Sequence, residues 1–211
     1  MLLAYLWLAG CTSDTMLRLT GNSAHTVSAY KRFFRQLVTS MLDDDDTIIG
    51  GPGIVVEVDE TKMGKRKYNR GHRVDGAWVI VGVEVGTSER GVFAEVVVDR
   101  SAETIAGVLE RHIAEGSTLH TDCWKGYGLI SERFGIQHFT VNHSVGFKDC
   151  TTGVHTNTVE GTNYAIKRAI PPRNRTRGCL QPYLAEFIWR RKNASRLWES
   201  FLDALREIVY D

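Results

Sequence analysis

The chain has 211 residues, a mass of 23.7 kDa and a formal net charge of +1, with 43% hydrophobic and 24% charged residues. These values are typical of one medium domain with a small appendage, or of two small domains, and they exclude disordered and fibrous proteins. No apolar run approaches the roughly 20 residues that cross a bilayer. The four cysteines stand apart with no CxxC spacing, which argues against a zinc site or a disulfide framework and favours a reducing compartment.

The first ten residues are apolar, and Leu8-Ala9-Gly10-Cys11 resembles a lipoprotein cleavage site. A secretory signal has a positively charged segment before its apolar stretch, and no Lys or Arg precedes this one. We therefore interpret the segment as a packed first helix.

Residues 1–42 are predicted to form a small helical region that resembles a helix-turn-helix. Ser23 is a suitable N-cap for a helix over residues 24–42, and a glycine-containing turn separates that helix from a short one before it. The polar face of the second helix supplies three candidate DNA contacts: Lys31, Arg32 and Arg35. The alternative is an ordinary helical hairpin with a solvated basic face.

Residues 43–53 combine four consecutive aspartates with a Gly-Gly-Pro-Gly segment. Charge repulsion and backbone breakers are typical of a linker, so we expect a domain boundary here that makes few contacts. A solvated linker is favoured over a metal site for the aspartate run.

After the linker, β-branched runs bounded by turn signals predict strands, and later segments have helical periodicity. The expected strands are 54–59, 77–85, 92–98, 118–121 and 138–141, and the expected helices are 102–114, near 124–134, 157–170, 183–192 and 194–209. Three antiparallel strands, a helix, a parallel strand, a helix, a strand and a helix follow the order of an α/β ribonuclease-H-like, retroviral-integrase-like fold. We assign it to residues 54–193, with residues 194–211 as a C-terminal helix.

Three acids occupy places where this fold could bring them together. Asp59 ends the first strand, Asp122 follows the fourth strand on the face of His120, and Glu160 opens a helix. The first and fourth strands are neighbours in such a sheet, so Asp59 and Asp122 are expected close enough to bridge one metal. Taken singly, each acid has a structural alternative as a turn or helix-terminus residue. His120 is a reserve candidate that could orient a water, and a hydrogen-bonded structural role is the alternative.

Carboxylates in this arrangement suit Mg²⁺, which prefers hard oxygen ligands and keeps several waters. Two such ions about 3.5–4 Å apart stabilise both the attacking and the leaving oxygen of a phosphoryl displacement. We therefore expect Mg²⁺, with two ions and with Mn²⁺ as a substitute. Tyr164 and Lys167 are expected on the same helix face as Glu160.

Two cationic segments predict local binding of a polyanion. The candidate phosphate contacts in them are Lys65, Arg66, Lys67, Arg70, Lys167, Arg168, Arg173, Arg175 and Arg177. Among other residues near the acids, Trp124 and Tyr127 are expected in the core, and Cys123 is expected to be buried and inert.

Several longer motifs resemble the DDE transposases of the Merlin superfamily and the related bacterial insertion-sequence transposases with an ISXO2-like domain. In order, they lie at residues 57–60, 64–71, 99–104, 121–127, 141–144, 155–162 and 186–192. The resemblance covers about residues 51 to 193, and it implies a core that cuts and joins DNA with two divalent metals.

Carried over residue by residue, the resemblance makes Asp59 and Asp122 the first two acids of the catalytic and metal-binding triad, and Glu160 the third. Asn157 is the reserve candidate for the third position, because some relatives are described with Asn there. Lys167 matches a basic residue that would hold a phosphate or a terminal base pair. Relatives usually carry Trp directly after Glu-Gly-Thr, whereas this chain has Asn163.

The resemblance therefore implies a transposase that cleaves double-stranded DNA at terminal inverted repeats and transfers the 3′-hydroxyl into target DNA. A homodimer or larger assembly on DNA is expected, without membrane association, in a nucleus or in a bacterial cytoplasm and nucleoid. The alternatives are a catalytically silent DNA-binding regulator and a stand-alone nuclease of the same fold.

Overall fold

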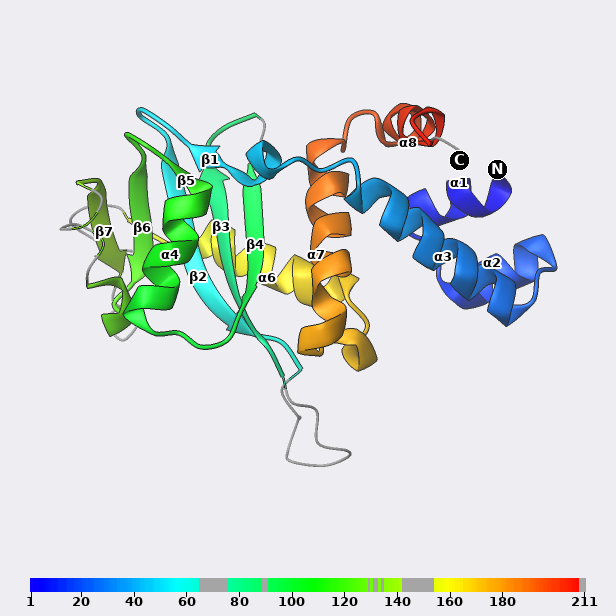
Figure 1. Ribbon diagram of the computed structural model, residues 1–211, viewed down its shortest axis with the longest axis horizontal. Coiled ribbons are helices and arrows are strands. Elements are labelled where there is room, and N and C mark those ends of the chain that lie inside the picture. Colours follow the sequence, from blue (N-terminus) through cyan, green and yellow to red (C-terminus); the bar gives the residue numbers. More distant parts are fainter. Residues whose placement is uncertain are drawn as a thin grey trace.

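The structure is a computed structural model that describes residues 1–64, 76–88, 91–128, 130, 133, 135–141 and 154–208. In this part of the chain five strands form a mixed sheet in the order β4-β3-β2-β6-β7 (Figure 1). The strands are β2 (Val55–Lys62), β3 (Trp78–Val85), β4 (Val92–Val97), β6 (Thr118–Asp122) and β7 (Gln137–Val141). The first three pair antiparallel, β6 runs parallel to β2, and β7 runs parallel to β6. This order and these directions confirm the predicted ribonuclease-H-like fold.

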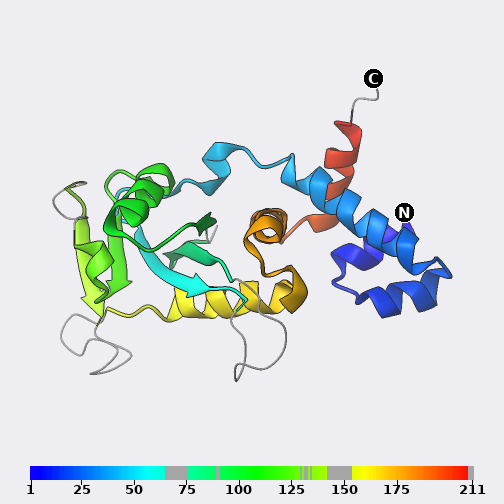
Figure 2. The same cartoon turned by 60° about the horizontal axis from the view of Figure 1, so that its bottom comes forward.

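Helices cover both faces of the sheet, because the central strands bury side chains in both directions (Figure 2). The helix α4 (Ala102–His112) packs on one face, over a cluster that includes Val56 and Val58. The helices α6 (Asn157–Ala169) and α7 (Arg177–Lys192) pack on the other face. Alternate residues of β2 therefore point into different layers. The odd-numbered side chains from Glu57 onward point toward α6, and this face holds the candidate acids.

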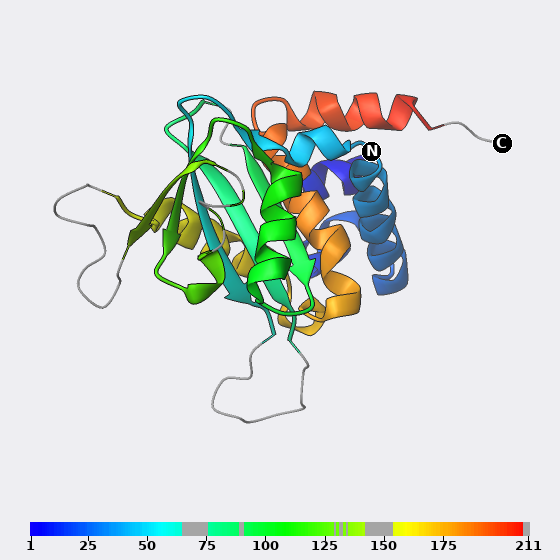
Figure 3. The same ribbon diagram turned by 60° about the vertical axis from the view of Figure 1, so that its left-hand side comes forward.

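The N-terminal helices form a third layer on α7 and do not stand apart from the core (Figure 3). This layer consists of α1 (Leu2–Leu8), α2 (Ser13–Thr20), α3 (Ala24–Thr39) and the C-terminal α8 (Leu197–Arg206). Trp7, Phe34 and Phe201 share one buried cluster with Trp189 of α7. The predicted first helix and the N-cap are confirmed, since α1 is packed and Ser23 Oγ accepts from Thr26 N at 3.1 Å.

The expectation of a linker with few contacts is wrong for the segment after residue 42. The short helix η1 (Asp44–Thr47) is followed by β1 (Ile49–Gly50), which pairs in parallel with β5 (Ile113–Ala114). The amides of Gly50 and Gly51 donate to Glu84 Oε1 and Ser117 Oγ, both at 2.8 Å. The polar composition of residues 43–53 did not indicate these contacts, because backbone groups make most of them.

Several predicted boundaries differ from the structure. The helix expected over residues 102–114 ends at His112, because Ile113 and Ala114 form β5 with β1. The helix expected from Tyr183 begins at Arg177 and contains Pro182 in its second turn. Pro182 is exposed, so the carbonyl that loses its amide partner there can be hydrated. Near residues 124–134 the described structure includes the 3₁₀ turn η3 (Lys125–Tyr127).

None of the helices in the described part of the chain has the length and apolar character that a membrane span requires.

Candidate active site

The candidate site lies where β2 and β6 separate. Their parallel pairing runs from Val55 opposite Thr118 to Glu57 opposite His120. The same register continued by two residues places Asp59 beside Asp122, and both point toward the α6 side of the sheet. In open α/β sheets, ligands bind outside the carboxyl ends of strands at such a point. Asp59 lies within β2, which extends to Lys62, rather than at its predicted end.

The carboxyl group of Asp59 is held in a strongly perturbed environment. Burial and then the negative charge of Asp122 raise the pKa of Asp59 to about 6, and Glu160 adds a smaller contribution in the same direction. Its neighbour Lys167 works in the opposite direction. Asp122 and Glu160 both act electrostatically on Asp59, and we call these three acids the electrostatic cluster.

Asn163 is a member of this site that the sequence analysis did not assign. It is 5% exposed, and its Nδ2 donates to Asp59 Oδ2 at 2.7 Å. Its Oδ1 is buried and has no hydrogen-bond partner among the described residues. Tyr164, which was expected on the Glu160 face, is 68% exposed, and Glu160 is exposed as well. The relevant signal was the i+3 spacing of Asn163 from Glu160.

Glu57 ties the first turn of α6 to β2. Its carboxylate is fully buried and accepts from Val159 N at 2.9 Å and from Thr158 Oγ1 at 3.2 Å. His155 Nδ1 lies 3.0 Å from Glu57 Oε1, the oxygen that also accepts from Thr158 Oγ1. The N-cap residue of α6, Thr156, makes no side-chain cap hydrogen bond. Glu57 therefore supplies the acceptor that a capping side chain would, and it fixes the turn that carries Glu160.

The remaining candidates lie on the rim of this cluster. Glu160 and Asn157 are both exposed in the first turn of α6. His120 is partly buried, and burial followed by the charge of His155 lowers its pKa. Its ring meets Phe139 edge-on at 5.8 Å. The charges of Asp122 and Glu160 thus both reach Asp59, and His120, within β6, lies close enough to His155 for that charge to act on it.

A second carboxyl group lies on the opposite face of β2. Burial raises the pKa of Glu60 to about 7, with Asp122 and Asp59 contributing, while the nearby Tyr127 hydroxyl and Arg100 act against them. Tyr127 is 2% exposed, which confirms its expected place in the core. Trp124 was expected in the core as well, and this was wrong, because its side chain is 41% exposed. Cys123, expected to be buried, is also exposed.

The donor set suits a hard divalent cation in part. Within the described ranges, no group of three His, Cys, Asp or Glu side chains is arranged to hold one ion. Asp59 and Asp122 supply carboxylate oxygens whose negative charges repel each other. Asn163, whose Nδ2 donates to Asp59, adds a buried Oδ1 that has no hydrogen-bond partner among the described residues. Two carboxylates completed by waters or phosphate oxygens are an ordinary ligand set for Mg²⁺.

The candidate phosphate-binding cations differ in their exposure to solvent. Arg32, Arg168, Arg173 and Arg177 are exposed, and Lys167 is partly buried near Asp59. The candidates at Lys65, Arg66, Lys67 and Arg70 lie outside the described residues.

Three of the predicted DNA contacts are engaged inside the protein. Arg35 pairs with Glu186 at 2.8 Å and stacks 3.7 Å from the centre of the Tyr183 ring. The guanidinium of Arg175 donates to the carbonyls of Ile170 and Lys167 at the end of α6. Lys31 Nζ donates to Ser13 Oγ at 3.1 Å. The basic face of α3 is therefore turned largely toward α7 and α2.

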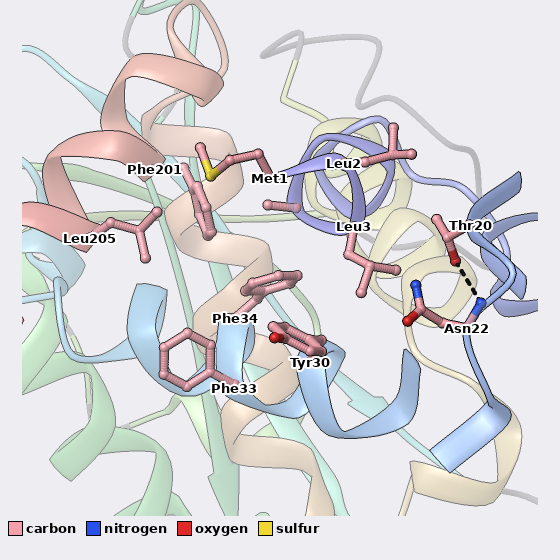
Figure 4. Close-up of a pocket in the computed structure, with 11 residues that line it drawn as sticks. Met1, Leu2, Leu3, Thr20, Asn22, Tyr30, Phe33, Phe34, Phe201 and Leu205 are labelled. Atoms are coloured by element: carbon pink, nitrogen blue, oxygen red, sulfur yellow. Dashed lines mark hydrogen bonds between the residues drawn. The ribbon is translucent and has the colours of Figure 1, made fainter. Parts of the chain in front are cut away.

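A pocket of about 410 Å³ lies away from the acids, among α1, α2, α3 and α8 (Figure 4). Its lining is mainly apolar and includes Tyr30, Phe33 and Phe201. In the part of the chain that the structure describes, no carboxyl group lines it. The candidate acids therefore lie where β2 and β6 separate and not in this pocket.

A ribonuclease-H-like sheet with acids on its first and fourth strands has the architecture of a DDE transposase. The family model of the ISXO2-like transposase domain matches residues 43–192. The chain therefore belongs to the ISXO2-like transposase family.

Other comparisons add less. The crystal structure of the catalytic core domain of BIV integrase aligns over 72% of this chain and 95% of its own, with 16% identity and a TM-score of 0.39. The fold assignment rests on the strand order and directions and does not depend on this alignment. No protein of curated function matched the chain.

Proposed function

We propose that this transposase cleaves DNA strands at transposon ends and transfers the resulting 3′-hydroxyl into target DNA. Asp59, Asp122 and Glu160 are the proposed catalytic and metal-binding acids. The observation that carries this proposal is the electrostatic cluster where β2 and β6 separate. There Asp122 and Glu160 both raise the pKa of Asp59. Such mutual repulsion is relieved when a cation binds.

The proposed ligands are the Asp59 and Asp122 carboxylates, with Glu160 approaching from α6. A bound Mg²⁺ or Mn²⁺ ion would polarise the scissile phosphate and favour formation of the attacking oxyanion. Asn163 orients Asp59 through its 2.7 Å hydrogen bond. The amide of Trp124 similarly holds Asp122 Oδ1 at 2.9 Å. These two contacts fix the direction of both carboxylates before DNA arrives.

Double-stranded DNA, as transposon ends and as target, is the proposed substrate. Four exposed arginines and Lys167 are the proposed phosphate contacts in the described part of the chain: Arg32, Arg168, Arg173 and Arg177. Arg35, Arg175 and Lys31 are left out because partners within the protein bind their charged groups. A homodimer or larger assembly on DNA is proposed, because cutting two ends and joining them requires more than one active site.

Asp59→Asn and Asp122→Asn test the site. Each change is expected to abolish strand cleavage and joining in Mg²⁺ and Mn²⁺, while DNA affinity stays the same or rises because less negative charge faces the phosphates. Glu84→Gln is the matched control, because Glu84 is a buried carboxylate of β3 whose partners lie away from the acids. Cleavage that survives either aspartate change would refute the assignment. Cleavage without joining on a terminal-repeat substrate would indicate a nuclease.

A further inference from the structure

Two tryptophans and two cations form a row beside the acids. The guanidinium carbon of Arg100 lies 4.0 Å from the centre of the Trp78 ring and 4.4 Å from that of Trp124. Lys62 Nζ lies 5.2 Å from the centre of the Trp78 ring. Arg100 is thus in cation–π contact with both indoles, which limits the movement of all three side chains.

This row is joined to the candidate site through Trp124, and to the opposite face of β2 through Glu60. The backbone amide of Trp124 donates to Asp122 Oδ1 at 2.9 Å. Arg100 Nη1 lies 3.9 Å from Glu60 Oε2, and Glu60 follows Asp59 directly in β2. The exposed indole of Trp124 is therefore attached to the loop that positions one of the two central carboxylates.

Packing does not account for the position of Trp124. The side chains of Trp7 and Trp189 are 3% and 2% exposed in the core, whereas Trp124 is 41% exposed. Exposure of a large aromatic surface next to a polar site is typical of a binding element. A positively charged ligand is disfavoured here, because Arg100 and Lys62 would repel it.

We propose that Trp124, backed by Arg100, is a stacking platform for an unpaired DNA base adjoining the scissile phosphate. A nucleotide satisfies both parts of the row, since its base offers a flat π surface and its phosphate is attracted by Arg100 and Lys62. Stacking of bases on aromatic side chains is sequence-tolerant, because every base has a π face. The platform would hold the strand end next to Asp122. This inference rests on the proposed function, which supplies DNA as the ligand.

The test measures stacking without requiring cleavage. Duplexes carrying 2-aminopurine in a two-nucleotide single-stranded end are titrated with the full chain in EDTA, beside blunt duplexes in which the same base is paired. The unpaired probe is expected to lose fluorescence on binding the natural chain. Trp124→Ala should abolish this quenching. It should also weaken binding of the duplex with the single-stranded end about 5- to 150-fold, the range of one base–aromatic stack. Blunt-duplex affinity should change much less.

Two comparisons separate stacking from a folding defect. Trp124→Phe keeps an aromatic ring and should restore most of the affinity, whereas Tyr5→Ala, which removes an aromatic side chain that is 59% exposed on α1, should leave it unchanged. Replacing the unpaired bases by abasic residues should remove the difference between the natural chain and Trp124→Ala. The backbone amide that binds Asp122 is kept in both tryptophan variants.

Equal quenching by the natural chain and Trp124→Ala would overturn the inference, and so would a persistent difference on abasic ends. Cleavage assays of the same variants keep this outcome distinct from failure of the proposed function. Loss of stacking with normal dependence on Asp59 and Asp122 would refute the platform alone. Absence of any cleavage, together with Trp124-dependent quenching, would refute the transposase chemistry and leave the platform standing.

Discussion

Replacing Glu57 should show how the fold places the third acid of the site. Glu57→Ala removes the acceptor for Val159 N and Thr158 Oγ1 and leaves the Val159 amide buried without a partner. Loss of a helix-capping acceptor costs about 1 kcal/mol, and loss of a hydrogen bond to a charged group costs about 1.5–3 kcal/mol. We therefore expect the free energy of unfolding to fall by about 3 kcal/mol.

For a chain of this size, that loss corresponds to a decrease in Tm of roughly 6–12 °C, which thermal unfolding followed by circular dichroism would measure. The informative comparison is with Glu84→Ala, because Glu84 is also a buried carboxylate that accepts from backbone amides, those of Gly50 and Gly91. Both changes should lower Tm. Only Glu57→Ala should also weaken Mn²⁺ binding in calorimetry at a temperature where both variants are folded.

Equal Mn²⁺ affinity in the two variants would refute the reasoning that Glu57 positions the first turn of α6. A decrease in Tm below about 2 °C for Glu57→Ala would refute the energetic part, since it would mean that the buried amide finds another acceptor. Glu57→Gln keeps one carbonyl acceptor and should therefore fall between the natural chain and the alanine variant in both measurements.

Three further outcomes are expected. First, because the pKa of Asp59 is raised to about 6 in the folded chain, the metal-free protein should lose stability as pH rises from about 4 to 6. Asp59→Asn should flatten that loss in thermal unfolding, and an unchanged pH profile would contradict the assignment. Second, Arg173→Ala should flatten the slope of log DNA affinity against log salt by roughly one. Arg175→Ala should instead lower Tm, because Arg175 binds the carbonyls that end α6. Third, a chain shortened to begin at Gly50 should unfold at lower temperature and bind hydrophobic dyes, since the buried Trp189 would lose the cover of α3. Unchanged unfolding would mean that the N-terminal layer is independent of the core.

The fold could be predicted from the sequence because its strands and helices follow local rules. The β-branched runs, the hairpin connections and the order of elements were sufficient for the sheet order that the structure shows. Where a boundary was wrong, a distant partner decided it. Ile113 left the helical pattern because the backbone of Ile49 lies beside it, and no local feature of the sequence records that pairing.

The candidate site was predictable only in outline. Asp59 and Asp122 follow from strand register, and Glu160 from its place at the start of a helix. Asn163 and Glu57 could not be assigned in this way, because their roles depend on which face of α6 meets β2. Asn163 and Tyr164 are neighbours in α6, so a rotation of the helix by one residue position would change which of them faces Asp59. The packing of Val159 and Ile166 in the core fixes this rotation.

The contacts of the basic residues bear on how DNA recognition is divided within the chain. A recognition helix must present its polar face to a groove, and α3 turns Arg35 toward Glu186 of α7. Arg190 of α7 reaches back to the carbonyls of Trp7 and Leu8, so the same helix is bonded to α1 as well as to α3. The N-terminal layer is therefore attached to the helix that covers the sheet carrying the candidate site. A DNA contact made by Arg32 on α3 would be transmitted through α7 as a rigid unit, and the two regions would bind DNA in one fixed relation rather than as flexibly linked modules.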